Sequence, residues 1–277
     1  MKYKIVADSS CDLNEDLKNR MEVSLVPFKI NIDSDSYIDD ENIDVYDMID
    51  KMKVSPNPIK TSCPSPADFA AEYKDAENVF VVTISEQLSE TYNSAILAKD
   101  MIMEEFKDKF IHVFNSKSAS IGETLVAFKI KECIDEKLSN NQIVEKVEKF
   151  IGDMKTYFIS EDLGNLIKNG RILKTKGLII NALNIKPIMG ANSEGNIELV
   201  DKARGSKKAF KMLVDIIGDS GVKFEERILA ISHANALQKA IDLKDDLKHL
   251  NFKEILIVET KGLSTAYVND GGIIIAF

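Results

Sequence analysis

The first half of the chain alternates short apolar segments with longer helical patterns, and this alternation limits its possible folds more than any other feature. The apolar segments lie at 2–7, 78–84 and 111–116. Most are followed by residues whose apolar positions recur three and four apart, which is typical of amphipathic helices. A repeated strand–helix order predicts a mostly parallel sheet with helices on its faces. We therefore expect an α/β domain in the first half.

The second half has a different pattern, with two apolar segments around Glu194–Gly195 that predict a β-hairpin. Further strand and helix patterns follow, and the last seven residues read as a strand. These features predict a second, smaller mixed α/β domain. We place the N-terminal domain at 1–155 and the C-terminal domain at 156–277. Segments 163–172 and 176–183 are expected to be helical, and segment 55–66, which contains four prolines, a structured loop.

Small polar residues follow three apolar strands of the first half. They are Asp8–Ser9–Ser10, Thr83–Ser85 and Asn115–Ser116. Ligands bind at the carboxyl ends of the strands in open parallel sheets, and helix N-termini at this edge favour anions. Each residue alone could simply cap a helix. Ser94, however, lies a turn inside a predicted helix and too late to be its cap, so we predict an anion-binding edge.

Composition and short motifs argue against several classes of protein. The net charge is −9, with no basic block of the kind that nucleic-acid binding needs. No apolar stretch reaches the roughly 20 residues of a membrane span, and no signal-peptide pattern is present, so we expect a cytoplasmic protein. The three cysteines are scattered, which favours a reducing compartment. No Cys/His cluster predicts a metal site.

Eight short motifs occur in a characteristic order along the chain. They are IVADSS, TSCPSPADF, ISEQLSETYNSA, NSKSASIGE, KNGRI, IKPI, KARG and ISHA. In number, order and spacing they resemble the DegV family of bacterial fatty-acid-binding proteins, and the resemblance covers the whole chain. It implies two α/β domains with one long-chain fatty acid in a tunnel between or beneath them. It also implies a non-catalytic carrier, without cofactor or metal, that presents the bound acid to a fatty acid kinase.

The resemblance also implies which residues contact the ligand. Thr61 and Ser94 would hold the carboxylate, with Ser62 and Thr91 as neighbours. Three further residues are candidates for contact with the head group or the partner. They are Arg171 of the GR motif, Arg204 of the RG motif, and Ser116 at a strand end.

The sequence departs from the family pattern at three places. Glu90 replaces a usual glycine and would repel a carboxylate unless it points to solvent. Cys63 replaces a common glutamine. Many members carry a histidine followed by GPG near the C-terminus, where this chain has ETKGLSTAYVNDGG. We expect Glu259 or Thr260 near the place of that histidine. Its loss would affect the kinase interaction more than lipid binding.

Simple energetics fit a lipid carrier. Burial of about fifteen methylenes at ~0.8 kcal/mol each offers on the order of 12 kcal/mol before the costs of association. The tail would therefore provide affinity, while hydroxyl donors offset the burial of an ionised head. Two alternatives remain open. One is a serine hydrolase or acyl-transfer enzyme that uses Ser94 or Ser116 with His233, although the G-x-S-x-G motif is absent. The other is a binding module for a different anionic amphiphile.

Overall fold

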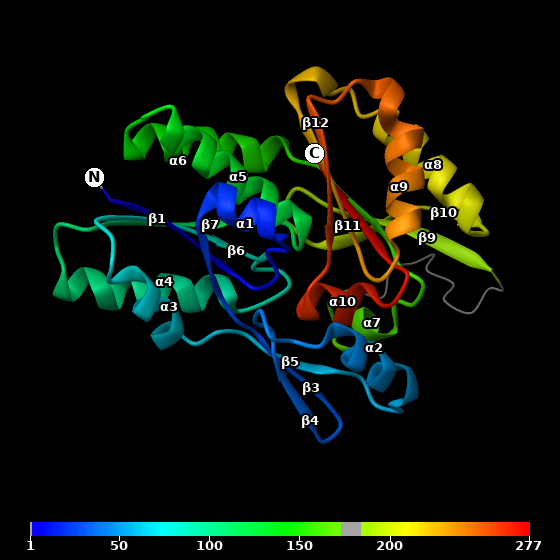
Figure 1. Ribbon diagram of the computed structural model, residues 1–277, viewed down its shortest axis with the longest axis horizontal. Coiled ribbons are helices and arrows are strands. Elements are labelled where there is room, and N and C mark those ends of the chain that lie inside the picture. Colours follow the sequence, from blue (N-terminus) through cyan, green and yellow to red (C-terminus); the bar gives the residue numbers. More distant parts are fainter. Residues whose placement is uncertain (1, 173–183) are drawn as a thin grey trace.

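The computed structural model describes residues 2–172 and 184–277, and it contains three sheets (Figure 1). The expected helix at 176–183 lies outside the described residues. The other segment expected to be helical contains α7 (Gly164–Lys168). The two larger sheets lie in the two halves of the chain, and the smallest sheet packs below both in the view of Figure 1. A mixed α/β architecture with two separate large sheets confirms the predicted fold class.

The first sheet, sheet A, is parallel throughout, as predicted. Its strands run in the order β2-β1-β6-β7. Their bounds are β1 (Tyr3–Asp8), β2 (Val23–Val26), β6 (Asn78–Thr83) and β7 (Phe110–Asn115). All six residues of β6 are buried, because helices cover both faces of the sheet. The covering helices are α1 (Glu15–Met21), α3 (Pro66–Tyr73), α4 (Thr91–Glu105), α5 (Ile121–Asp135) and α6 (Asn140–Asp153).

A small antiparallel sheet, sheet B, branches from sheet A at Pro27, where β2 ends and the chain leaves the first sheet. Its strands are β3 (Lys29–Ile32), β4 (Asp35–Ile38) and β5 (Lys60–Ser62), and α2 (Val45–Val54) packs on it. The loop prediction for 55–66 was therefore wrong at its centre, where Thr61 pairs with Ile30. A three-residue strand between prolines has too short a pattern to be recognised in sequence.

The third sheet, sheet C, is mixed and has the order β10-β9-β8-β13-β11-β12. Its strands are β8 (Thr156–Ile159), β9 (Ile185–Ala191), β10 (Ile197–Arg204), β11 (Ile228–His233), β12 (Glu254–Glu259) and β13 (Ile273–Ala276). The β9–β10 pair is antiparallel, which confirms the predicted hairpin. Helices α8 (Ser206–Gly218), α9 (Leu237–Leu247) and α10 (Gly262–Val268) accompany it, with two 3-10 turns at Phe224–Glu226 and Lys248–Leu250. The boundary at 155 remains a prediction.

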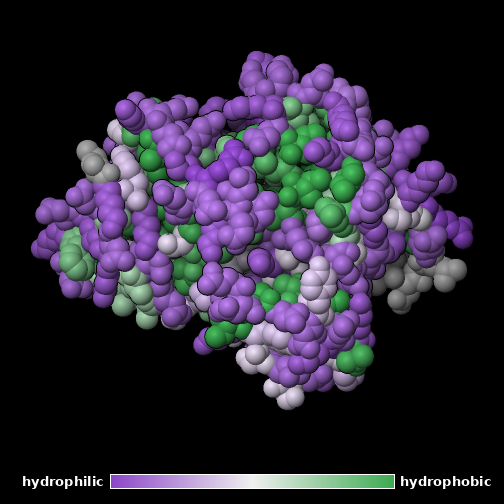
Figure 2. Space-filling view, viewed as in Figure 1, coloured by the Kyte–Doolittle hydropathy of each residue, from purple (hydrophilic) through white to green (hydrophobic). Residues whose placement is uncertain are grey.

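Helix α5 connects the two halves of the molecule, because it lies against β1 and β6 of sheet A and against β11 and β13 of sheet C. Its first seven residues are all buried. The opposite face of sheet C packs against α8 and α9, which lie on the right in Figure 1. Most of the surface in Figure 2 is polar, with an apolar area near β12, one of the two edge strands of sheet C.

Candidate functional site

A narrow cavity of about 100 Å³ lies where the three sheets meet. Its walls come from the strand ends of sheet A, from sheet B, from sheet C and from α10. Apolar side chains such as Phe28, Phe158 and Ile274 form much of its lining. A concave, mostly apolar space with a few polar groups is the usual form of a small-molecule binding site.

One wall of the cavity carries a pair of hydroxyl groups from distant parts of the chain. Thr61 Oγ1 and Tyr267 OH lie 2.9 Å apart, and both residues line the cavity. Thr61 projects from β5, and Tyr267 lies in the last turn of α10. Each hydroxyl can donate one hydrogen bond. The pair can therefore rearrange to present donors to a carboxylate.

Arg171 is the predicted cation at the cavity, and it lines the space together with Leu88. Its Nε donates to the carbonyl of Leu88 at 3.1 Å, and Nη1 donates to the carbonyl of Asn169. A guanidinium has five N–H donors, and the contacts of Arg171 with described residues leave others for a ligand. No acidic side chain in the described part of the chain forms an ion pair with Arg171.

Only some of the hydroxyl groups in the SETYNSA segment lie near the cavity. Ser89 lines the cavity, and its hydroxyl lies 2.8 Å from that of Thr91, which is buried behind it. Neither caps α4, which begins without a side-chain cap. Ser94 is half-buried on α4 and is not among the lining residues. Glu90 is exposed and accepts a hydrogen bond from Asn93, so its carboxylate points to solvent.

The remaining predicted residues lie away from the cavity lining. Ser62 is exposed next to Thr61, and Arg204 is exposed at the end of β10. Ser116 is buried and donates to the carbonyl of Ser118 at 3.2 Å. Of the predicted site residues, Thr61 and Arg171 line the cavity. Thr91 does not line it, but its hydroxyl is within hydrogen-bonding distance of a residue that does, Ser89.

Glu259 and Thr260, which we expect near the place of the family's histidine, both lie outside the cavity lining. Glu259 is exposed and accepts a hydrogen bond from Tyr46 at 2.9 Å. Thr260 is buried and its hydroxyl lies 2.6 Å from that of Thr265. Neither lines the cavity, whereas Tyr267 does. The position of Tyr267 at the cavity could not be predicted from the sequence, because α10 is too short for a helical pattern to assign its faces.

Buried carboxylates fix the beginning of α10, the helix that carries Tyr267. The N–H groups of Gly262 and Leu263 donate to the two oxygens of Asp39, at 2.7 and 2.9 Å. The N–H of Lys261 donates to Asp12 at 2.7 Å. Gly262 is required there, because a Cβ would lie 2.6 Å from Asp39 Oδ1. These contacts bind α10 of the C-terminal half to the N-terminal half.

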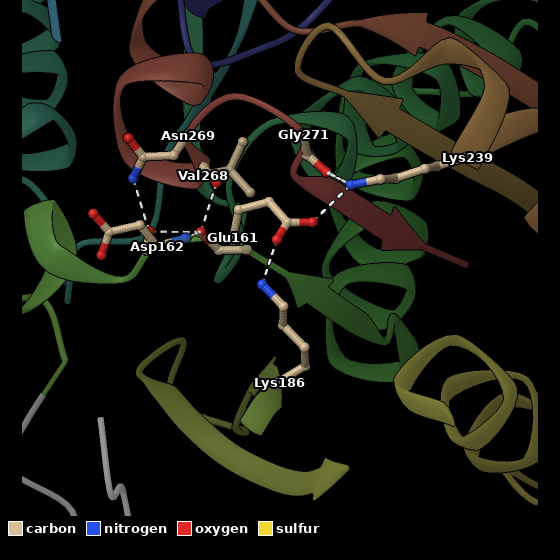
Figure 3. A network of polar contacts seen from close by, with 8 residues as sticks. Glu161, Asp162, Lys186, Lys239, Val268, Asn269 and Gly271 are labelled. Carbon is tan, nitrogen blue, oxygen red and sulfur yellow. Dashed lines mark hydrogen bonds and ion pairs between the residues drawn. The ribbon is translucent and has the colours of Figure 1, made fainter. Parts of the chain in front are cut away.

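A second polar network fixes the end of the same helix (Figure 3). The hydroxyl of Ser160 donates to the carbonyl of Val268 at 2.6 Å, and the Asn269 side chain donates to the carbonyl of Asp162 at 2.7 Å. Beside them, Glu161 forms ion pairs with two lysines. These are Lys186 and Lys239, and Lys239 also donates to the carbonyl of Gly271. With both ends of α10 held, the position of Tyr267 is well defined.

Sequence reasoning missed a group of buried carboxyl groups behind the cavity. Burial is the main cause that raises the pKa of Asp8 to about 7, that of Asp12 to about 7 and that of Asp39 to about 6. Glu123 is also fully buried, and desolvation raises its pKa well above the ordinary value. Neither of its oxygens has a hydrogen-bond partner among the described residues. Burial thus favours the protonated form of Glu123.

The geometry does not support the hydrolase alternative. His233 lies at the end of β11, and its Nδ1 accepts a hydrogen bond from the N–H of Ala236 at 3.3 Å. Burial lowers its pKa. Within residues 2–172 and 184–277, no hydrogen bond joins His233 to Ser94 or Ser116. The same residues contain no cluster of metal-ligating side chains and no helix able to cross a membrane.

Fold and site together define an α/β protein of two large sheets and one small sheet, with a mostly apolar cavity where the three meet. The chain belongs to the DegV family, whose family model matches residues 2–277. A DegV domain-containing protein of Streptococcus gordonii is 34% identical over 281 residues, covering 100% of this chain and 99% of the relative.

Solved structures of DegV proteins are similar over nearly the whole chain. One from Ruminococcus gnavus, described with vaccenic acid, has a TM-score of 0.96 and 41% identity, covering 99% of both chains. The Streptococcus pneumoniae Fatty Acid Kinase (Fak) B3 protein, loaded with linoleic acid, has a TM-score of 0.91 and 31% identity, covering 100% of this chain and 99% of that one. The family and fold inferred from the motifs are thus confirmed.

Proposed function

We propose that this protein binds one long-chain fatty acid in the cavity between its sheets and carries it without catalysing a reaction. The observation that supports this most strongly is the Thr61–Tyr267 hydroxyl pair on the wall of a mostly apolar cavity that Arg171 also lines. Similar DegV structures hold vaccenic and linoleic acid. The cavity is narrow, so we expect its walls to move apart when the alkyl chain enters.

The carboxylate would lie against Thr61, Tyr267 and Arg171. An ionised carboxylate loses its hydration on burial and needs several donors in compensation. The two hydroxyls and those N–H groups of Arg171 that have no partner among the described residues would supply them. Ser89 lines the same space and Thr91 supports it. Ser94 is part of the site only if α4 or its N-terminal turn shifts on binding.

The proposed partner is a fatty acid kinase, because the similar S. pneumoniae protein is described as part of such an enzyme. Arg204 is exposed, and Lys207 and Lys208 are exposed in the first turn of α8, the helix that follows. None of the three forms an ion pair with a described residue. They are suitable for contact with an acidic surface of the kinase. We place the carrier in the cytoplasm, in keeping with three free cysteines.

Mass spectrometry of the protein purified from a bacterial host tests this function. Native spectra should show an adduct with the mass of a C16 or C18 acid, and denaturing spectra should show the bare chain. A covalent adduct on a serine would favour an acyl-transfer enzyme. A phospholipid or other anionic amphiphile in place of the acid would overturn the fatty-acid assignment.

A further inference from the structure

Four carboxyl groups lie together behind the cavity, and the function proposed above uses none of them to contact the ligand. They are Asp8, Asp12, Asp39 and Glu123, with 0–2% of each residue exposed. In the described part of the chain, no lysine or arginine forms an ion pair with any of them. A buried carboxyl group without a cation tends to take up a proton instead of remaining charged.

Only one layer of residues separates these groups from the cavity. Ser10 and Ser120 line the space. The N–H of Ser10 donates to Asp8 at 2.9 Å, and the hydroxyl of Ser120 donates to Asp12. Glu123 follows one turn later on α5, where its N–H donates to the carbonyl of Ser120 at 3.0 Å. A charge in the cavity therefore acts on the cluster across a short distance.

The cluster is also connected to the proposed head-group position through α10. Asp39 accepts hydrogen bonds at the start of this helix, and Tyr267 lies five residues after Gly262. At about 1.5 Å per residue, this separation is about 8 Å along the axis. A carboxylate about 10 Å away, at an effective dielectric constant of about 20, raises the pKa of an acid by roughly one unit.

The charges of other acidic groups of the cluster raise the pKa of Asp8, Asp12 and Glu123, whereas the charge of Lys261 lowers that of Asp39. Asp39 faces Asp8 and Asp12, and both of these face Glu123. Lys261 is the cation that acts on Asp39. The thiol of Cys11 faces the cluster but stays protonated, because burial raises its pKa well above the ordinary value. An additional negative charge thus enters a region that already carries excess negative charge.

We propose that binding of a fatty-acid anion is coupled to uptake of a proton by the Asp8–Asp12–Asp39–Glu123 cluster, so that affinity rises as the pH falls from about 8 to about 6. This inference rests on the proposed function. The proton comes from the solvent and adds to a carboxylate oxygen, and no other bond forms or breaks. The buried acids thus act as a proton-linked control of loading and release.

Binding of cis-parinaric acid tests the coupling, because its fluorescence can be followed in a protein that has no tryptophan. Wild-type protein should bind it about three- to tenfold more tightly at pH 6 than at pH 8. Calorimetry in two buffers of different ionisation enthalpy near pH 7 should show uptake of a fraction of a proton per ligand. Binding without proton uptake would overturn the inference and leave the proposed function intact.

Asp12→Asn is the most suitable variant, because an asparagine can still accept from the N–H of Lys261 and donate to Ser120. It should reduce both the proton uptake and the pH dependence. Asp16→Asn, four residues along and exposed, is the matched control and should change neither.

Asp39→Asn serves as the second variant if Asp12→Asn does not fold. If the folded variant takes up as much proton per ligand as the wild type, the proton binds to the ligand and not to the cluster, and the inference is overturned. No binding at any pH would overturn the proposed function and the inference together.

Discussion

The hydroxyls of Thr61 and Tyr267 lie 2.9 Å apart, although 206 residues separate them in the chain. Thr61 belongs to the small sheet of the N-terminal half, and Tyr267 to a short helix near the C-terminus. Their meeting point lies on the wall of the cavity. The position of each donor therefore depends on how the two halves of the molecule are held together.

Removing either hydroxyl should weaken fatty-acid binding. A hydrogen bond to a charged group contributes about 1.5–3 kcal/mol, so Thr61→Val and Tyr267→Phe should each lower the affinity by roughly ten- to a hundredfold. Fluorescence titration with cis-parinaric acid measures the change. Ser62→Ala is the control, since Ser62 is exposed beside Thr61. Wild-type affinity in both Thr61→Val and Tyr267→Phe would show that the carboxylate binds elsewhere.

The two candidate arginines should separate binding from partner recognition. Arg171 lines the cavity, so Arg171→Gln should lower ligand affinity at least about tenfold through loss of a charge-assisted hydrogen bond. Arg204 is exposed, so Arg204→Gln should leave ligand affinity unchanged and slow acyl phosphate formation by a fatty acid kinase. Equal loss of ligand affinity in both variants would contradict this division.

Stability should fall as the pH rises from about 4 to about 7.5. Asp8, Asp12 and Asp39 have pKa values raised to about 7, 7 and 6, against an ordinary value of 3.8. In this window the folded protein retains protons that the unfolded chain has lost, so unfolding releases protons and a higher pH favours it. The free energy of unfolding should be on the order of 3–5 kcal/mol larger at pH 5.5 than at pH 8.

Urea denaturation at a series of pH values measures this slope. Asp12→Asn removes one of the titrating groups, so its stability should depend less steeply on pH than that of the wild type. Asp16→Asn, at an exposed position, should reproduce the wild-type slope. A stability that rises between pH 5.5 and 8 would mean that these carboxyl groups are ionised and well solvated in the folded protein.

Two glycines should respond in opposite directions to replacement by alanine. At Gly262 a Cβ would lie 2.6 Å from Asp39 Oδ1 and 2.5 Å from Ile43 Cδ1. Gly262→Ala should therefore destabilise the protein by about 1–3 kcal/mol through overpacking.

Gly152 lies in α6 with open space around its Cβ position. Gly152→Ala should stabilise by about 0.5–1 kcal/mol, because alanine has the higher helix propensity. Thermal denaturation of the two variants compares them directly, and a stable Gly262→Ala would show that α10 is loosely held.

The local pattern of the chain was sufficient to predict the parallel sheet and the β9–β10 hairpin, because alternating segments and a Glu–Gly turn are short-range signals. It also indicated that hydroxyls gather at the strand ends. It could not reveal Tyr267 as a cavity residue, because that depends on Asp39 capping a helix 223 positions away. Nor could it reveal that Glu123 is buried. A glutamate on a helix usually faces solvent, but here both large sheets cover the start of α5.

A crystal structure with a terminally brominated C16 acid tests the central claim most directly. Anomalous scattering from the bromine would locate the tail, and the electron density would show the head. We expect the carboxylate within about 3.2 Å of Thr61 Oγ1 and Tyr267 OH, and the bromine deep between sheets A and C. A carboxylate distant from both hydroxyls, or a chain bound outside the cavity, would contradict the account.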